Sequence, residues 1–260
     1  MKKVLLFLLV AVMVFSFAAC APKTSPAPAP EAGAKYEGTY TAALKMGTNA
    51  AFPPYEYKEG EKFVGIDIEI AEAIAKELGT TLEVVDMEFD SIIASVQKGE
   101  VQVGIAGMTV TEDREKEVNF THSYATGVQV VIVKADSSIA SLEDLEGKKI
   151  GTQLGTTGDM YSKDDYGEEN VTSYGKGADA IIALKGGDVD AVIIDNEPAK
   201  AFVAENEGLK ILETEYAVED YAIAVSKDNA TLLADINKAL EKLTADGTID
   251  SIIAKYIKAE

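Results

Sequence analysis

Strand-like and helix-like segments alternate along this chain of 260 residues, and this alternation constrains its fold more than any other feature. Between 66 and 78, large aliphatic residues recur at every fourth position and Gly79 follows, which predicts a helix that ends there. Similar patterns predict strands at 44–47, 82–87, 101–106, 128–133, 149–152 and 191–194, helices at 91–98 and 178–184, and apolar-periodic segments at 232–243 and 249–257. Strands alternating with helices predict an α/β protein with parallel sheets covered on both faces.

The first residues have the pattern of an export signal. Met1-Lys2-Lys3 is a short basic start, 4–17 is an almost unbroken apolar run, and small residues precede Cys20. This order is typical of a secretory signal peptide, predicted here as 1–19. The apolar run is shorter than the roughly 20 residues that a membrane-spanning helix needs.

Cys20 is the only cysteine, so no intramolecular disulfide can form. It stands where a bacterial lipobox places the residue that becomes lipidated at the start of the mature chain. Phe17 departs from that pattern, which prefers an aliphatic residue there, and ordinary cleavage near an incidental cysteine is the alternative. A lipid on Cys20 would hold the protein at a membrane surface without spanning it. The rest of 20–41 is rich in proline and alanine, which predicts a tether.

Charge and residue usage exclude several functions. Acidic residues outnumber basic ones by 44 to 24, and the resulting formal net charge of -20 repels nucleic acids and anionic lipid headgroups. His122 is the only histidine, so a zinc site of the usual ligands is implausible. The sequence has no GxSxG nucleophile motif and no Walker A motif. We therefore expect no metal and no cofactor.

Arg114 is the only arginine among the basic residues. A guanidinium differs from an ammonium in offering a planar fork that matches a carboxylate, so a lone arginine suggests a carboxylate site, with a surface helix position as the alternative. The predicted strand 101–106 ends shortly before it, and ligands of open α/β sheets bind at such strand ends. Thr109 and Glu112 have the spacing of a capping box for the helix that would carry Arg114.

Two strand ends in the second half of the chain repeat this arrangement. After strand 149–152, a helix is expected to begin near Thr156 and Thr157, where free N–H groups favour a carboxylate. After strand 191–194, Pro198 fits a first helical turn, so Asn196 or Glu197 is the expected cap. Asp195 would then be free to accept hydrogen bonds from an ammonium, with a helix cap as its alternative role. A guanidinium, a helix start and an aspartate together match the zwitterion of an α-amino acid.

Six segments carry a specific resemblance. They are, in order, GTNAAFPPYEY, FVGIDIEIAEAIAKELG, MEFDSIIASVQKG, AGMTVTEDREKEVNFTHSY, IGTQLGTTGDMY and DAVIIDNEP. From about residue 42 to the C-terminus the chain resembles the polar amino acid family of periplasmic-type solute-binding proteins, the receptors of ABC importers. The resemblance implies a fold like that of type II periplasmic-binding proteins, with two α/β lobes joined by two crossover strands. Lobe 1 would hold 42–126 plus 223–260 and lobe 2 would hold 127–222.

The resemblance also implies roles for individual residues. Arg114 would clamp the ligand carboxylate, and Asp195 would accept from the α-ammonium. Further contacts are implied for the side chain of Thr109, for the backbone of Ala106 and Gly107, for Thr156 and Thr157 at the carboxylate, for Phe52 and Phe89 as aromatic walls, and for Asn49 and Gln153 near the ligand side chain.

The identity of the ligand turns on Asn49, because this position is acidic in many binders of basic amino acids. An unpaired buried charge is costly, so an amide there favours a neutral polar ligand such as glutamine. Arginine, lysine or histidine is the alternative, since Phe52 and Phe89 could stack on a guanidinium. A cyclohexadienyl or arogenate dehydratase is a more distant alternative. The expected protein is not an enzyme but an extracytoplasmic, lipid-anchored monomer that closes on a free amino acid and delivers it to the membrane subunits of an importer.

Overall fold

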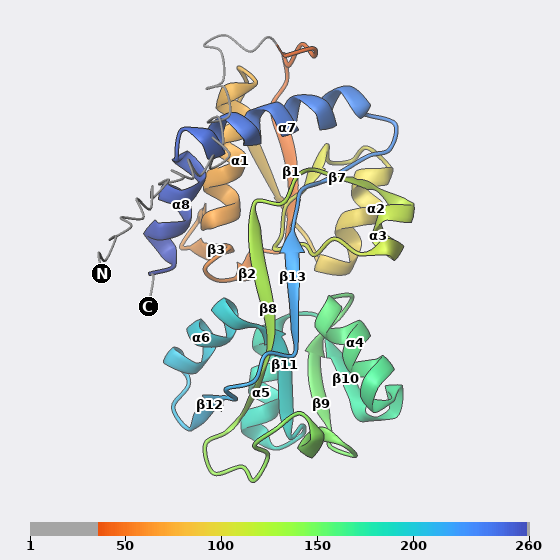
Figure 1. Ribbon diagram of the computed structural model, residues 1–260, viewed down its shortest axis with the longest axis vertical. Coiled ribbons are helices and arrows are strands. Elements are labelled where there is room, and N and C mark those ends of the chain that lie inside the picture. The colour runs from red at the N-terminus through yellow and green to blue at the C-terminus, as the bar shows by residue number, and fades with distance from the viewer. Residues whose placement is uncertain (1–35, 259–260) are drawn as a thin grey trace, which may run out of the picture.

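The computed structural model describes residues 36–258, which form two lobes joined by two long strands (Figure 1). The predicted signal peptide, Cys20 and most of the predicted tether lie outside the described residues. The chain leaves the first lobe along β8 (Ala125–Lys134) and returns along β13 (Ala217–Tyr221). The predicted two-lobed α/β architecture is confirmed.

The sheet of the first lobe has five strands in the order β5-β1-β6-β14-β7. Their bounds are Leu44–Thr48 for β1, Leu82–Asp86 for β5, Val103–Gly104 for β6, Asn119–Phe120 for β7 and Ala224–Val225 for β14. β5, β1 and β6 are parallel, but β14 is antiparallel to both of its neighbours. The prediction of purely parallel sheets is therefore wrong here, because β14 enters from the opposite side after the return crossing.

The second lobe has the strand order β10-β9-β11-β8-β12, with β13 also paired to β8. The remaining bounds are Ile150–Gln153 for β9, Val171–Tyr174 for β10, Ala191–Asp195 for β11 and Leu209–Ile211 for β12. β9, β10 and β11 are parallel, whereas β8 runs antiparallel to β11, β12 and β13. Every residue of β11 is buried, as expected for an apolar strand covered on both faces.

Helices cover both sheets (Figure 1). The α-helices are α1 (Ile66–Glu77), α2 (Ile92–Gln97), α3 (Glu112–Glu117), α4 (Thr157–Tyr166), α5 (Gly177–Gly186), α6 (Asn196–Glu205), α7 (Ala230–Ala245) and α8 (Thr248–Tyr256). Short 3-10 turns lie at Phe89–Ser91, Glu143–Leu145 and Glu168–Asn170. In the first lobe, α1, α7 and α8 pack together on one side of the sheet and α2 and α3 lie on the other.

A small three-stranded sheet links β1 to α1 and was not predicted. It consists of β2 (Ala51–Phe52), β3 (Glu56–Glu59) and β4 (Lys62–Val64), all antiparallel. At its end, a Cβ on Gly65 would lie 2.2 Å from the carbonyl oxygen of Tyr55, and Gly65 has φ +125, so only glycine fits. The backbone N–H of Asp67 donates to that same Tyr55 carbonyl at 2.9 Å. The tight turn therefore brings the start of α1 against the start of β3.

The two crossing strands pair with each other, from Ala217 opposite Gln129 to Tyr221 opposite Ala125. The ring of Tyr221 lies over Gly127, where a Cβ would come within 2.2 Å of it. The absence of a side chain at Gly127 leaves room for the end of the Tyr221 ring against β8. The hinge region therefore carries a buried tyrosine between the lobes.

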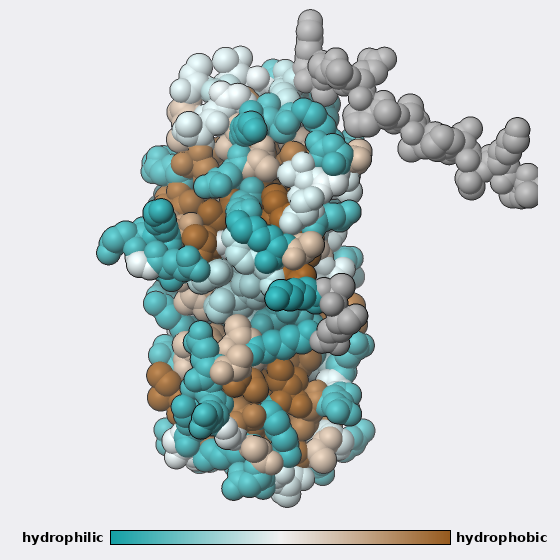
Figure 2. Space-filling view, turned by 90° about the vertical axis from the view of Figure 1, so that its left-hand side faces the viewer, coloured by the Kyte–Doolittle hydropathy of each residue, from teal (hydrophilic) through white to brown (hydrophobic). Residues whose placement is uncertain are grey.

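The surface agrees with the acidic composition. Figure 2 shows hydrophilic residues spread over both lobes, with hydrophobic residues between them. The exposed large apolar side chains of residues 36–258 are Leu154, Ile182 and Val218. Within the same range, no helix is both long and apolar enough to cross a membrane.

The described end of the predicted tether contacts the first lobe. The backbone N–H groups of Glu37 and Gly38 donate to the carboxylate of Asp235 on α7 at 2.8 and 2.7 Å. The Tyr40 hydroxyl donates to the same carboxylate at 2.8 Å, and the Tyr36 hydroxyl donates to Glu77 at 3.2 Å. These bonds hold residues 36–40 on α1 and α7.

Candidate ligand-binding site

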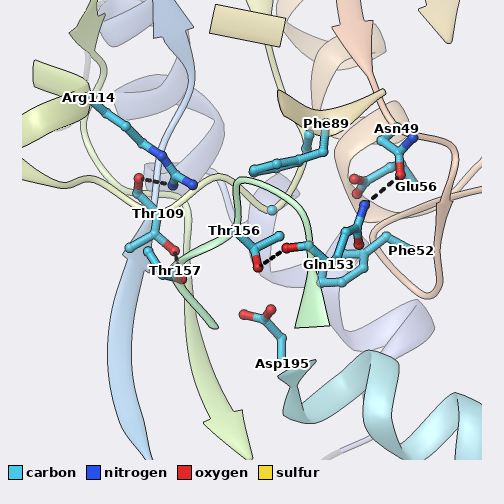
Figure 3. A pocket seen from close by; sticks show the side chains of 12 residues that line it. Asn49, Phe52, Glu56, Phe89, Thr109, Arg114, Gln153, Thr156, Thr157 and Asp195 are labelled. Atoms are coloured by element: carbon cyan, nitrogen blue, oxygen red, sulfur yellow. Dashed lines mark hydrogen bonds between the residues drawn. The ribbon is translucent and has the colours of Figure 1, made fainter. Parts of the chain in front are cut away.

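A cavity lined by residues of both lobes lies between them (Figure 3). All eleven residues predicted for ligand binding line it, and Glu56 joins them. The first lobe contributes Asn49, Phe52, Glu56, Phe89, Ala106, Gly107, Thr109 and Arg114, and the second contributes Gln153, Thr156, Thr157 and Asp195. Their common position follows from the topology, because the carboxyl ends of the parallel strands in both sheets face each other across the cavity.

Arg114 lies on one side of the cavity, and the residue is only 8% exposed. It donates to the carbonyl oxygen of Thr109 at 2.7 Å and to that of Gly155, in the second lobe, at 3.0 Å. Its guanidinium carbon is 5.4 Å from the centre of the Phe89 ring. Burial lowers the pKa of Arg114, but an arginine remains a cation at any physiological pH. Its remaining N–H groups can receive an anion.

The helix that carries Arg114 begins later than the sequence predicted. Thr111, not Thr109, is its N-cap, and the Thr111 hydroxyl accepts from the backbone N–H of Arg114 at 3.2 Å. Thr109 instead forms a bridge with Tyr221 of the returning strand, which holds its backbone extended. The capping-box prediction for Thr109 and Glu112 is therefore wrong, and the Thr109 hydroxyl instead lies at the cavity, where it donates to Glu219.

The start of α4 faces the cavity, as predicted. The Thr156 hydroxyl accepts from the backbone N–H of Asp159 at 3.2 Å and donates to the carbonyl oxygen of Gln153 at 2.8 Å. This cap leaves the N–H groups at Thr157 and Gly158 without a partner inside the helix. An anion placed between this helix start and Arg114 would meet donors from both lobes.

Asp195 is the N-cap residue of α6, but its side chain does not cap the helix. The helix begins at Asn196, so the prediction that Asn196 or Glu197 is the cap is wrong. The Asp195 carboxyl instead accepts from the Tyr221 hydroxyl. Burial raises its pKa to about 7, the Tyr221 hydrogen bond opposes that shift, and the nearby Glu219 adds to it. A cation at this carboxyl would restore its ionised form.

Glu219 is a buried acid that the sequence analysis missed. One of its carboxylate oxygens accepts from Thr157 at 2.8 Å, from Gln129 at 2.9 Å and from Thr109 at 3.2 Å. These three donors come from the second lobe, a crossing strand and the first lobe, so Glu219 ties them together at the hinge. No local pattern in AVEDY distinguishes this glutamate from a surface residue. The partners that stabilise it become neighbours only in the folded chain.

The opposite side of the cavity is built from amides and an aromatic ring. Asn49 donates to the carbonyl oxygen of Met87 at 2.7 Å, and its own carbonyl accepts from the Gln153 amide at 3.0 Å. The Asn49–Gln153 bond joins the two lobes directly. Phe52 packs beside it, with Gly107 so close that a Cβ there would lie 3.1 Å from the Phe52 ring. The Gly107 N–H donates to Asp67, so a ligand contact from this residue would use its carbonyl oxygen.

Glu56 is the second acid that the sequence analysis missed. It lines the cavity beside Asn49 and is 1% exposed, and one of its oxygens has no hydrogen-bond partner among residues 36–258 (Figure 3). Burial raises its pKa well above its usual range, with further contributions from Asp67 and Asp195. The segment EYKE of β3 runs from buried at Glu56 to exposed at Glu59 without a two-residue alternation, so no local pattern marks Glu56 as pointing inward.

Replacing Gln153 with alanine should weaken the closed arrangement of the lobes. The change removes the donor to Asn49 and leaves a buried carbonyl without its partner, which costs about 1 kcal/mol, or roughly a fivefold loss of ligand affinity. Isothermal titration calorimetry with the tightest-binding ligand measures the loss. Gln97→Ala, which removes an exposed glutamine of α2, is the matched control and should leave affinity unchanged. Equal affinity in both variants would contradict a role for the interlobe amide pair.

Comparison with known proteins agrees with the two-lobed structure. The profile of bacterial extracellular solute-binding proteins, family 3, matches residues 44–259. The chain is 34% identical to the arginine-binding extracellular protein ArtP of Bacillus subtilis over the full length of both chains. An ancestral arginine-binding protein is 45% identical to the present chain. Its structure with glutamine has a TM-score of 0.79, and the match covers 84% of the present chain and 99% of the ancestral one. Its structure with arginine has a TM-score of 0.78, and the match covers 83% and 98%.

A third relative marks the breadth of this fold. The ancestral amino acid-binding protein AncCDT-1, a precursor of cyclohexadienyl dehydratase, is 31% identical with a TM-score of 0.78, and the match covers 84% of this chain and 96% of that chain. The match of the family profile extends over most of the chain and includes every residue that lines the cavity. The chain belongs to the bacterial extracellular solute-binding proteins, family 3.

Proposed function

We propose that this protein is an extracytoplasmic, lipid-anchored receptor that captures one free L-amino acid with a polar side chain and delivers it to an ABC importer. One observation carries the proposal. A guanidinium from the first lobe and a carboxyl from the second, Arg114 and Asp195, face one small buried cavity. A zwitterion supplies a carboxylate for the first group and an ammonium for the second.

Binding and closure are coupled in this proposal. The ligand carboxylate lies between Arg114 and the start of α4, and the ammonium lies against Asp195. Because these groups belong to different lobes, the ligand makes its full set of contacts only when the lobes are closed, so it shifts the population toward the closed form. The importer subunits then recognise the closed form, and the lipid on Cys20 keeps the receptor near them.

The side chain of the ligand is proposed to end in an amide or a guanidinium. ArtP and the ancestral protein are named for arginine, and the ancestral protein was also solved with glutamine. The preference for glutamine over arginine rested on the amide at Asn49. Glu56 supplies a carboxyl at the same end of the cavity, so a cationic side chain has a partner there as well.

A thermal-shift screen of the twenty amino acids tests this function. At a ligand concentration a hundred times its Kd, binding adds about 2.7 kcal/mol to the free energy of unfolding, which raises the melting temperature by several degrees. We expect shifts with L-glutamine and L-arginine, no shift with their D-isomers, and no shift with aspartate, whose side chain would face Glu56. The absence of a shift with every amino acid at millimolar concentration would contradict the proposal.

A dehydratase is the second candidate, favoured by the likeness to AncCDT-1 and by the buried carboxyl of Glu56 with its raised pKa. A general acid of that kind would be needed to expel a hydroxyl group. Incubation with prephenate or arogenate, followed by detection of the aromatic product, separates the two candidates. We expect no product, because the Arg114 and Asp195 pair fits a saturated zwitterion.

A further inference from the structure

The buried carboxyl group of Glu56 lies at one end of the cavity, and the buried carboxyl group of Asp67 lies next to it, behind the cavity wall. Glu56 is 1% exposed and Asp67 is 0% exposed. The turn at Gly65 fixes their proximity, because the N–H groups of Ile66 and Asp67 donate to the carbonyls of Pro54 and Tyr55, just before Glu56, at 3.0 and 2.9 Å. The backbone thus holds the first residues of α1 and β3 together whatever occupies the cavity.

The hydrogen bonds of this pair leave two oxygens without partners. One oxygen of Asp67 accepts from the backbone N–H of Gly107 at 2.7 Å. The other oxygen of Asp67 and one oxygen of Glu56 are buried without a partner among the described residues. The Tyr124 hydroxyl lies near Asp67 and can supply one proton to this pair of oxygens. One hydroxyl hydrogen does not satisfy both oxygens, whereas a protonated carboxyl group can donate to its neighbour, so the pair favours one bound proton.

The groups that face the pair carry no positive charge. Asp67 on α1 and Asp195 at the end of β11 act on Glu56, and Tyr55 and Tyr124 also lie within its electrostatic reach. Burial and these carboxylates raise the pKa of Glu56, and burial raises the pKa of Asp67 to about 6. Arg114, on the other side of the cavity in Figure 3, is engaged with Thr109 and Gly155.

We propose that Glu56 and Asp67 share one proton in the ligand-free protein, that this proton stays when the ligand side chain is an amide, and that it leaves when the side chain is a cation. The inference rests on the proposed function. With the ligand carboxylate on Arg114 and its ammonium on Asp195, the side chain extends toward Glu56. The protonated Glu56 offers a carbonyl oxygen to an amide N–H. A guanidinium stabilises the second carboxylate, and the proton passes to solvent.

Proton release makes the selectivity of the site depend on pH. A ligand that expels one proton binds up to about tenfold more tightly for each unit of pH, from near the usual carboxyl pKa of 4.5 up to the raised pKa of the free protein. The affinity ratio of arginine to glutamine should rise over that window. Asp195 titrates with both ligands, because both carry the same ammonium, so its contribution cancels in the ratio.

Isothermal titration calorimetry in buffers of different ionisation enthalpy counts the protons. We expect arginine to release about one proton more than glutamine does, and the affinity ratio to follow the pH dependence above. In Glu56→Gln, the extra proton and the pH dependence of the ratio should disappear, with at least a tenfold loss of arginine affinity and a smaller change for glutamine. Glu59→Gln, an exposed glutamate of the same strand, is the matched control and should behave like the original protein.

A second variant, Asp67→Asn, tests the inference even if Glu56→Gln does not fold. Asp67→Asn retains an acceptor for Gly107 but removes the neighbouring charge, so Glu56 should ionise at lower pH and the extra proton release should shrink. Equal proton counts for arginine and glutamine in the original protein, or an unchanged affinity ratio in Glu56→Gln, would overturn the inference and leave amino acid binding intact. If neither amino acid binds, the proposed function fails and the inference falls with it.

Discussion

Alanine in place of Arg114 should abolish measurable binding at micromolar ligand. The change removes the guanidinium that faces the cavity and leaves a ligand carboxylate buried beside carbonyl oxygens. Breaking a buried ion pair by removing one partner costs about 3–5 kcal/mol, which corresponds to a Kd weaker by a factor of roughly a hundred to several thousand. Calorimetric titration with glutamine and arginine measures the loss.

Two further variants separate the effect of the planar guanidinium from the effect of a positive charge alone. Arg114→Lys keeps the charge but loses the planar fork, so its affinity should lie between those of the original protein and Arg114→Ala. Lys116→Ala removes an exposed cation from the same helix, where it pairs with Asp113, and should leave affinity unchanged. Because Arg114 also bonds Thr109 and Gly155, the melting temperature of each ligand-free variant must be compared. Near-normal affinity in a well-folded Arg114→Ala would refute the assignment.

Lowering the pH below about 7 should weaken the binding of every amino acid ligand through Asp195. Burial raises the pKa of the free carboxyl to about 7, whereas a bound ammonium favours the carboxylate. Binding below pH 7 therefore requires a proton to leave, and affinity should fall by up to about tenfold per pH unit as the pH drops. Above pH 7 this dependence should vanish.

Asp195→Asn should remove that pH dependence and weaken binding at neutral pH by about 3 kcal/mol or more, because the ammonium loses its counter-charge. Titrations of both proteins with glutamine from pH 5 to 8 provide the measurement, since glutamine adds no charged side chain. Asp188→Asn, an exposed aspartate of the same lobe, is the matched control. A pH profile that survives in Asp195→Asn would assign the titration to another group.

Much of the architecture could be predicted because burial leaves a local signature in the chain. The four-residue repeat of isoleucine between 66 and 78 marks α1, and the apolar run at 191–194 marks β11. The direction of a strand leaves no such signature. β13 is antiparallel to β8, and β14 to β6, because the chain returns from the second lobe. The apolar pattern of a short segment is the same whichever way its strand runs.

The residues of the candidate site also fall into those that the sequence predicts and those that it does not. The eleven predicted residues follow strand ends or belong to recognisable motifs, and all of them line one cavity. Glu56, Glu219 and Tyr221 were missed, because acids and tyrosines are ordinary surface residues until distant segments bury them. Thr111 caps α3 in place of the predicted Thr109, and Thr109 pairs instead with Tyr221, 112 positions further along the chain.

In the proposed lipid-anchored receptor, the bonds from residues 36–40 to α1 and α7 would determine which lobe stays still. An anchor upstream of Tyr36 would hold the lobe that carries Arg114, and the proposed closure would move the lobe that carries Asp195. Immobilisation through the N-terminus would therefore leave the motion free. A reporter dye on the exposed Ile182 of α5 would move with the lobe that carries Asp195. The same dye on α7 would stay with the held lobe and serve as the reference.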